Sequence, residues 1–416
     1  MQKVVTFGCR LNFYESDLIK NQLEDVKDSD IVVINTCAVT NQAEKQVKQT
    51  IRKINRQDPK KKIVVVGCAA QLDPKSYAGM QGVFKVLGNI EKLDKKNYQS
   101  EQKVLVGDIS KVKDQPNFAV TQFTQRSRAF LQIQNGCDHD CTFCAITTAR
   151  GNNRSIPQDL LISEIKKMVS KGFNEVVLTG VDITDYGKDI FGKPSLSLLL
   201  KKILDQVKEL PRLRLSSIDV AETDDLLLSL MQEEERLMPH LHISLQSGDP
   251  IILKRMKRRH TPDQVHEFCQ KCSGLKRNIA FGADIIAGFP TETEEMFDST
   301  YRLLKDIKIP FLHVFPFSAK HGTKAALMPQ IPQNLRKQRA KELIKLGKKN
   351  LQSFYQQQVG SIHSAILEDA SNSIARSQNF CLVKVNNLKK PKAGQILSAK
   401  IIAAEDEYLI GQEIEV

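Results

Sequence analysis

Short apolar runs alternate with longer amphipathic stretches along the first hundred residues of the chain. Uninterrupted runs of four or five mostly apolar residues predict strands, and apolar positions recurring every three or four residues predict helices. The helices are expected at about 13–23 and 43–56, and the strands at 3–7, 31–34, 63–66, 84–87 and 103–106. Alternation of strand and helix predicts an N-terminal α/β domain, residues 1–107, built on a parallel sheet.

The middle of the chain repeats this alternation after a polar stretch without a clear period, 108–127, which we interpret as an interdomain linker. Helical patterns lie at about 157–171, 195–207, 249–275 and 292–306. Six strands are expected, at 129–133, 175–179, 212–216, 241–245, 279–286 and 311–315. Six units fall short of the eight of a complete barrel, so we predict an open, partial (β/α)6 barrel over 128–350. Its chemistry is expected at the carboxyl ends of the strands.

The last part of the chain begins with a long basic helical pattern at 332–358. Short strand-like runs separated by turn signals follow it to the end of the chain. About five short strands in roughly 60 residues predict a small all-β barrel over 351–416, a fold that often binds nucleic acid. A purely structural cap is the alternative, because small barrels serve many roles.

The charge of the chain suggests a polyanionic partner. The formal net charge is +13 over 416 residues, and basic segments stand at 254–260, 336–349 and 389–392. Nucleic acid is the first candidate for such a partner, and a generally lysine-rich surface is the alternative. No apolar run reaches the length of a membrane span, and the start of the chain does not read as a signal peptide. With cysteines placed as in metal sites, these features favour a reducing cytoplasm.

Three cysteines are packed into eight residues just after the first barrel strand. Cys137, Cys141 and Cys144 have the spacing C-x3-C-x2-C. Three thiolates on one loop can take three corners of a cubane iron–sulfur cluster and leave the fourth iron open to a small molecule. A zinc loop is the alternative, but no second cysteine pair lies nearby, and His139 inside the loop is poorly placed as a fourth ligand.

Three further cysteines follow three predicted strands of the N-terminal sheet. Cys9, Cys37 and Cys68 each stand just beyond a strand's last apolar residue. Carboxyl ends of parallel strands share one edge, so we expect the three thiols to converge there as a second three-cysteine site. Three separate buried cysteines are the alternative. The remaining Cys269, Cys272 and Cys381 are interpreted as packing residues, because a metal site would need more ligands from elsewhere.

The three-cysteine loop after the first barrel strand resembles that of the radical S-adenosylmethionine superfamily. The whole chain, with its second cysteine triplet, resembles the methylthiotransferase family, and within it the MtaB-type branch that acts on tRNA N6-threonylcarbamoyladenosine. The motifs that carry the resemblance are GCRLN (8–12), NTCAVT (35–40), QNGCDH (134–139), LTGVDI (178–183), LRLSSI (213–218), SLQSGD (244–249) and ADIIAGFPTET (283–293). The stretches AITTARG (145–151) and FPFSAKHGT (315–323) depart from the family pattern, which bears on substrate contacts and not on the cluster cysteines.

The resemblance implies two [4Fe–4S] clusters, one on each cysteine triplet, and S-adenosyl-L-methionine on the open iron of the loop cluster. Cleavage of that cofactor would release a 5′-deoxyadenosyl radical, and the second cluster would handle the inserted sulfur. Contacts with S-adenosylmethionine are implied for Phe143, Thr179, Gly180, Ser216, Gln246, Ala287 and Gly288. The C-terminal barrel resembles the RNA-contacting TRAM domain.

The implied activity is insertion of a methylthio group at carbon 2 of the modified adenosine beside the tRNA anticodon. The implied partners are a tRNA anticodon stem-loop, a reductant protein and a sulfur donor, without a membrane. Methylthiolation of an isopentenyl-adenosine tRNA or of a ribosomal-protein aspartate is one alternative. A non-enzymatic iron–sulfur RNA-binding sensor is the other.

Overall fold

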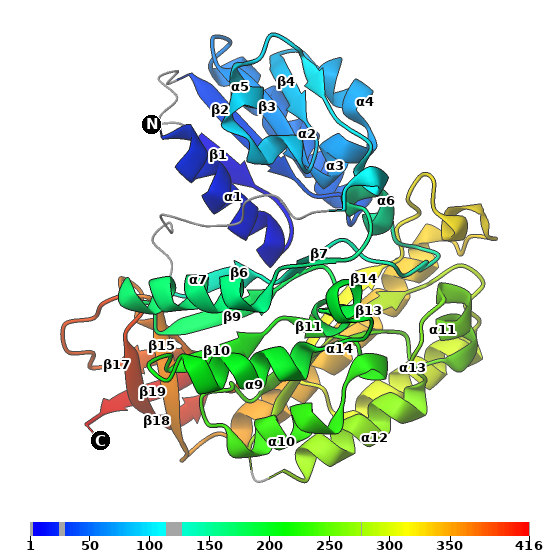
Figure 1. Ribbon diagram of the computed structural model, residues 1–416. Helices are drawn as coiled ribbons and strands as arrows, with labels where there is room; N and C mark the ends of the chain where they lie inside the picture. Colours follow the sequence, from blue (N-terminus) through cyan, green and yellow to red (C-terminus); the bar gives the residue numbers. More distant parts are fainter. Residues whose placement is uncertain (1–2, 25–29, 114–126, 276, 416) are drawn as a thin grey trace.

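The computed structural model describes residues 3–24, 30–113, 127–275 and 277–415. An N-terminal sheet domain sits above an open barrel, and a small barrel at the C-terminal end of the chain covers one end of the larger one (Figure 1). Among the described residues, no helix combines the length and apolar character needed to cross a membrane.

The N-terminal domain is a five-stranded parallel sheet whose strands lie in sequence order, as predicted. The central strands are apolar on both faces, which is expected where helices cover a parallel sheet on both sides. The last strand has two residues where four were expected. The strands are β1 (Lys3–Thr6), β2 (Ile31–Thr36), β3 (Lys62–Gly67), β4 (Val83–Leu87) and β5 (Val104–Leu105), and the helices are α1 (Arg10–Leu23), α2 (Asn41–Gln57), α3 (Cys68–Leu72), α4 (Pro74–Ala78) and α5 (Lys95–Gln99).

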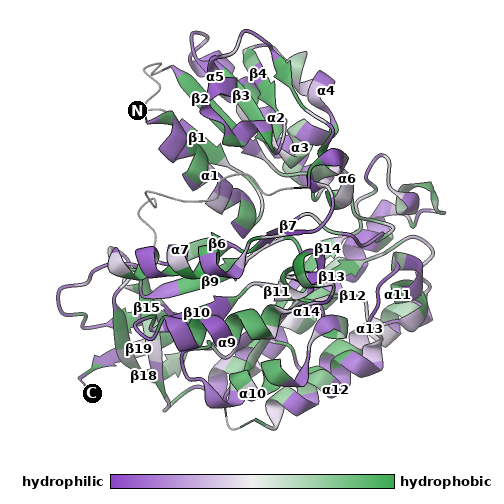
Figure 2. Cartoon of the chain, viewed as in Figure 1, coloured by the Kyte–Doolittle hydropathy of each residue, from purple (hydrophilic) through white to green (hydrophobic). Residues whose placement is uncertain are grey.

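The central body is a parallel, open barrel with six strand positions, which confirms the predicted fold. A single residue, Ser216, separates β10 from β11, so two hydrogen-bonded sheets form one continuous wall. The strands are β6 (Ala129–Gln132), β9 (Glu175–Thr179), β10 (Arg212–Leu215), β11 (Ser217–Ile218), β12 (His240–Gln246), β13 (Ala280–Ala287) and β14 (Phe311–Pro316). The outer helices include α7 (Gln158–Ser170), α9 (Leu196–Gln206), α10 (Asp225–Glu233) and α13 (Glu294–Ile307). Figure 2 shows the outer helices in mixed colours, hydrophilic on one side and hydrophobic on the other.

The prediction of one continuous helix over 249–275 is wrong, because the structure has two helices there. Helix α11 (Pro250–Met256) ends at Lys257, whose φ of 58° is left-handed, and α12 (Pro262–Ser273) begins after the capping box of Thr261 and Gln264. A proline at the first helical position favours a new start, since it lacks the N–H that would continue the preceding helix. The break brings Lys257, Arg258 and Arg259 to the three-cysteine loop, where their side chains contact residues of that loop.

Short elements that periodicity did not predict surround that loop. The antiparallel pair β7 (Gln134–Asn135) and β8 (Arg154–Ser155) brackets it, and α6 (Ile146–Arg150) follows it. Two-residue strands and a single-turn helix contain too few positions to show a period.

The C-terminal part consists of α14 (Gln333–Gln356) and a closed five-stranded barrel, as predicted. Its strands are β15 (Ile362–Asp369), β16 (Ile374–Ser377), β17 (Leu382–Asn386), β18 (Ile396–Ala404) and β19 (Leu409–Ile414). The small barrel docks against the amino ends of the large barrel's strands. There Arg214 donates hydrogen bonds to the carbonyl oxygens of Ser377 and Gln378, and the ring of His240 stacks on that of Phe380 at 4.2 Å.

Candidate active site at the domain interface

The loop that carries Cys137, Cys141 and Cys144 leaves β7 through Gly136, whose φ is +73°. A Cβ at this position would lie 1.8 Å from the carbonyl oxygen of Asn152, so only glycine fits. Backbone N–H groups donate to two of the sulfurs, from His139 to Cys137 at 3.4 Å and from Ile146 to Cys144 at 3.4 Å. Such N–H···S bonds are among the contacts that adjust the potential of thiolate-bound clusters.

The break between α11 and α12 supplies a contact to the third sulfur. Arg258 lies just after α11, and its Nη1 approaches Sγ of Cys141 at 3.7 Å. The loop is also tied to α11 by Thr142, whose N–H and hydroxyl donate to the carbonyl oxygens of Met256 and Arg255 at 3.1 and 2.8 Å. All three thiols of the loop therefore accept hydrogen bonds from named donors, and the loop is anchored to the barrel.

The second triplet occupies the carboxyl ends of three neighbouring strands in the N-terminal sheet. Cys9 follows β1, Cys37 follows β2, and Cys68 follows β3 as the first residue of α3. Gly8, with φ +97°, packs on Cys37 so closely that a Cβ there would lie 2.8 Å from its sulfur. The three thiols interact electrostatically with one another and with Arg150. Because the carboxyl ends of parallel strands share one edge of the sheet, three residues that are far apart in the sequence come together.

Arg150 links this triplet to the three-cysteine loop of the barrel, because it is the last residue of α6, the helix that follows that loop. Its side chain is buried, with 1% exposed, and its Nε donates to Sγ of Cys68 at 3.2 Å. The two terminal nitrogens donate to both carboxylate oxygens of Glu15 at 2.8 and 2.9 Å and to Oδ1 of Asn12 at 2.6 Å. Both acceptors belong to α1, so one arginine joins the barrel to the N-terminal sheet domain.

The charge on Arg150 is held inside the interface by carboxylate pairing. Burial alone would raise the pKa of Glu15, but Arg150 and Lys92 outweigh it and lower that pKa to about 2. Lys92 donates to Glu15 at 2.7 Å and is itself buried. A fully buried carboxylate with two cationic partners is thus part of the contact between domains. Neither hydropathy nor periodicity along the sequence predicted this buried group of charges.

Burial opposes ionisation of the thiols. It raises the pKa of Cys37 to about 11 and that of Cys144 to about 11, and it also raises the pKa of Cys9 and Cys137. Neighbouring thiols add to the increase for Cys37. Iron binding would stabilise the thiolates that burial disfavours.

The donor sets fit iron–sulfur clusters. Each site presents three thiols and N–H donors directed at sulfur. Three thiolates can hold three irons of a cubane and leave the fourth without a protein ligand.

The residues expected to contact S-adenosylmethionine lie at the carboxyl ends of the barrel strands. Thr179 and Gly180 follow β9, and Ser216 separates β10 from β11. The carbonyl of Gln134 lies 2.9 Å from where a Cβ of Gly180 would stand, so the backbone there has no room for a side chain. Gln246 ends β12 with a left-handed φ of 67°, which directs the chain sharply away from the strand.

The end of β13 is shaped by a second glycine. Ala287 is buried, and Gly288 follows it with φ +70° and donates its N–H to Glu292 at 3.0 Å. A Cβ on Gly288 would lie 2.4 Å from Cγ of Arg336, so α14 packs directly on this turn. Phe143 lies half-buried in a small apolar cluster, edge-to-face with Phe289 at 6.4 Å. All seven residues have positions on the barrel, and their contacts with a cofactor remain predictions.

A polar network beside the loop was not anticipated from the sequence. Nε2 of His139 lies 2.8 Å from Asp182 and 3.7 Å from Glu222, and it contacts Nη2 of Arg259 at 2.7 Å. The hydrogen bond to Asp182 raises the pKa of His139. His139 is thus engaged by carboxylates of the barrel mouth. The signal that could have revealed this was the placement of Asp182 in the turn after β9.

A second unanticipated network lies at the other end of the barrel, which we call the arginine cluster: Arg10, Arg128, Arg212, Arg214 and Arg376. Four of these place a guanidinium carbon within 6.0 Å of the centre of the Phe380 ring. Burial and the neighbouring Arg128 lower the pKa of Arg10 to about 10. The cluster joins α1, the start of β6, β10 and the C-terminal barrel, so no single stretch of sequence could have shown it.

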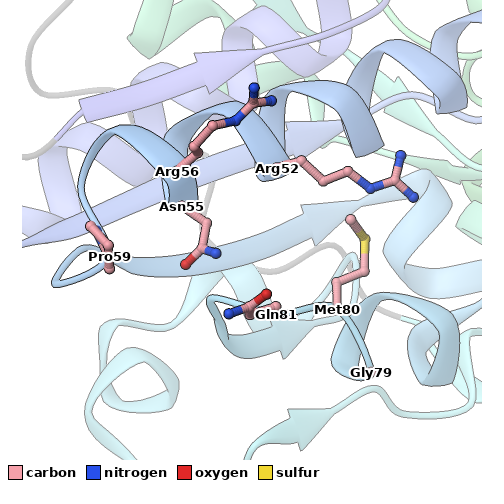
Figure 3. Close-up of a pocket in the computed structure, with 7 residues that line it drawn as sticks. All are labelled: Arg52, Asn55, Arg56, Pro59, Gly79, Met80 and Gln81. Carbon is pink, nitrogen blue, oxygen red and sulfur yellow. The ribbon is translucent and has the colours of Figure 1, made fainter.

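The other cysteines lie apart from both triplets. Cys269 and Cys272 are buried on α12 and pack in the main core, and Cys381 packs inside the small barrel. A hollow of about 680 Å³ lies on the N-terminal domain between the end of α2 and the turn before β4, lined by Arg52, Asn55, Arg56, Pro59, Gly79, Met80 and Gln81 (Figure 3). None of the predicted ligands lines it.

Comparison with known proteins agrees with this arrangement. Residues 131–304 match the radical SAM superfamily, and residues 2–88 match the uncharacterized protein family UPF0004. The fold resembles that of the radical S-adenosylmethionine methyltransferase TsrM from Kitasatospora setae, with a TM-score of 0.57, 12% identity and coverage of 75% of this chain and 72% of that one.

Relatives with higher identity cover nearly the whole chain. The threonylcarbamoyladenosine tRNA methylthiotransferase MtaB of Rickettsia prowazekii is 50% identical over 409 residues, covering 98% of this chain and 96% of the relative. The protein of the same name from Aquifex aeolicus is 36% identical, covering 92% of this chain and 96% of the relative. The chain therefore belongs to the MtaB family of radical SAM methylthiotransferases.

Proposed function

We propose that the protein inserts a methylthio group at carbon 2 of N6-threonylcarbamoyladenosine beside the anticodon of tRNA. The observation that carries the proposal is the placement of two cysteine triplets on either side of one interface, joined through Arg150 and Cys68. The names of the relatives supply the substrate. A tRNA substrate implies action in the cytoplasm, with a reductant protein and a sulfur donor as further partners.

The geometry suits a reaction that needs two iron–sulfur centres. The triplet Cys137, Cys141 and Cys144 would hold one [4Fe–4S] cluster, and Cys9, Cys37 and Cys68 the other. When bound with S-adenosylmethionine, the first cluster supplies a radical able to attack an unreactive C–H bond, and the second presents sulfur. Phe143, Thr179, Gly180, Ser216, Gln246, Ala287 and Gly288 would orient S-adenosylmethionine at the barrel mouth.

Access of the base to this interface requires that it leave the stack of the anticodon loop. Enzymes that react with a base commonly turn it outward into a protein pocket. The C-terminal barrel, residues 351–416, and the basic helix α14 would contact the RNA backbone, since cationic side chains that neutralise phosphates supply most sequence-independent affinity. We propose residues 1–107 and 128–350, joined by the linker 108–127, as the two cluster-bearing domains.

Mass spectrometry of tRNA nucleosides from cells that lack the protein tests the proposal. The 2-methylthio form of N6-threonylcarbamoyladenosine should disappear, and its unmodified precursor should accumulate. Complementation should succeed with the wild-type protein and with Cys381→Ala, and fail with Cys141→Ala. An unchanged nucleoside profile contradicts the proposal.

A second measurement separates an enzyme from an iron–sulfur RNA-binding sensor. Reduction of the reconstituted protein with S-adenosylmethionine present should release 5′-deoxyadenosine, whereas a sensor would bind RNA without cleaving the cofactor. The precedent for an open cubane site with three cysteines makes cleavage the expected outcome.

A further inference from the structure

Five guanidinium groups from three parts of the chain meet at the floor of the large barrel. The centre of the Phe380 ring lies 5.7 Å from the guanidinium carbon of Arg10, 6.0 Å from that of Arg128, 5.3 Å from that of Arg214 and 4.7 Å from that of Arg376. Arg212 completes the arginine cluster by sharing the partner of Arg214. Like charges this close require neutralising partners.

Only two carboxylates, Glu175 and Glu368, form ion pairs with the five arginines of the cluster among the described residues. Glu175 is fully buried and pairs with Arg212 at 2.8 Å, with Arg214 at 2.7 Å and with Arg128 at 3.5 Å. Glu368 pairs with Arg128 and, at 3.0 Å, with Arg376. The arginine cluster therefore keeps an excess of positive charge inside the protein.

Arg10 is the one member of the arginine cluster that forms no ion pair with Glu175 or Glu368. Within the described part of the chain, its guanidinium has no ion pair and no hydrogen bond, and it lies over the Phe380 ring. Arg10 is half-buried, whereas Arg212 and Arg214 are buried, so among these three Arg10 is the most accessible to an incoming group. Both ring nitrogens of the buried His240, stacked on the other side of the cluster, also lack a partner among the described residues.

The position of Arg10 connects the cluster to the proposed chemistry. It directly follows Cys9 in the chain, and its side chain extends from there to the Phe380 ring at the barrel floor. The guanidinium of Arg10 therefore lies within one side-chain length of the backbone that carries the N-terminal triplet.

We propose that the arginine cluster binds a carboxylate carried by the substrate nucleoside, with Arg10 as its principal contact. The proposal rests on the proposed function. N6-Threonylcarbamoyladenosine has a free carboxylate on the substituent at N6, whereas an isopentenyl substituent is a hydrocarbon without charge. A planar guanidinium binds a carboxylate through two parallel hydrogen bonds. The arginine cluster would then select the acid-bearing nucleoside over a neutral one.

The direct test compares two anticodon stem-loops that differ in one group. One carries the natural carboxylate on the N6 substituent, and the other carries the isosteric carboxamide. Wild-type protein should bind the acid roughly tenfold to a hundredfold more tightly, the range expected for hydrogen bonds to a charged group. Equal affinity for the two stem-loops, measured by fluorescence anisotropy, overturns the proposal without any variant.

Substitution of the free guanidinium locates the effect. In Arg10→Gln the ratio of the two affinities should fall to about one, since the neutral side chain no longer distinguishes acid from amide. Arg302→Gln removes an exposed arginine on α13 and should keep the wild-type ratio. An iron content of about eight per chain after reconstitution shows that Cys9 still holds its cluster beside the substituted residue.

The outcomes separate this proposal from the proposed function. If Arg10→Gln weakens binding of acid and amide equally, Arg10 contacts the RNA phosphates or positions Cys9, and the carboxylate assignment is wrong. If the wild-type protein methylthiolates acid and amide stem-loops equally well, only the carboxylate assignment fails. If it methylthiolates neither, the proposed function itself fails.

Discussion

Nε of Arg150 donates a hydrogen bond to Sγ of Cys68 at 3.2 Å, although 82 positions separate the two residues. The arginine follows the three-cysteine loop of the barrel, and the cysteine belongs to the triplet of the N-terminal sheet. One buried side chain therefore contacts a thiol of one proposed cluster and stands directly behind the loop of the other.

Arg150→Met should destabilise the contact between the two domains. The substitution leaves the buried Glu15 with Lys92 alone, and removing one partner of a buried ion pair costs about 3–5 kcal/mol. Urea denaturation of the iron-free protein measures the loss. Arg302→Met, on the exposed face of α13, should change the free energy of unfolding by less than about 0.5 kcal/mol. Equal stabilities of the two variants would mean that Arg150 does not hold the domains together.

Gly8→Ala and Gly136→Ala should each affect a different cluster. An alanine Cβ at position 8 would collide with Cys37, and one at position 136 with the carbonyl of Asn152 next to the loop. After anaerobic reconstitution, two cubanes give about eight irons per chain, and each variant should retain about four. Gly8→Ala should still release 5′-deoxyadenosine from S-adenosylmethionine, and Gly136→Ala should not. The same iron content and cleavage activity in both variants would refute the assignment of separate clusters.

Gly288→Ala tests how tightly α14 closes on the end of β13. Gly172 offers a matched control, because it also has a positive φ, +86°, but nothing lies within 4 Å of its added Cβ. Both variants incur the strain of a left-handed alanine, about 1–2 kcal/mol. Only Gly288→Ala also displaces Arg336, so its loss of unfolding free energy should be larger by about 1–3 kcal/mol. Equal losses of unfolding free energy in the two variants would indicate that α14 shifts to make room for the added Cβ at no measurable cost.

Glu175→Gln should flatten the dependence of stability on acid. Burial would raise the pKa of Glu175, but Arg214, Arg212 and Arg128 outweigh it and lower that pKa to about 2. The unfolded chain binds the proton more readily, so this contribution is present above about pH 4.5 and is lost as the pH falls toward 2. It amounts to roughly 3 kcal/mol. Urea denaturation of iron-free protein at pH 7, 4 and 3 should show a steeper decline for the wild type. Parallel declines would place the acid sensitivity elsewhere.

Prediction from the sequence succeeded where one residue's environment follows from its neighbours in the chain. The run 63–66 is short and rich in β-branched residues, which favours a buried strand, and a cysteine just after such a run is then expected at the strand end. Parallel strands share that end, so the convergence of Cys9, Cys37 and Cys68 followed from local patterns and one topological rule. The split of 249–275 was missed because a left-handed Lys257 leaves no trace in hydropathy, and the helix-start signal of Thr261, Pro262 and Gln264 was not used.

The sequence by itself determined the order of the elements, the parallel sheet, and the open and closed barrels. It also determined the two cysteine triplets, one closely spaced on a loop and one placed after three strands. The reason is that periodicity and cysteine spacing are properties of short segments and survive without tertiary context. The tertiary structure alone decided which charges become buried and paired. Arg150 contacts Cys68, and Arg10 contacts Phe380, because parts of the chain that are distant in sequence pack together. The energy of a buried charge depends on such partners, which no local pattern specifies.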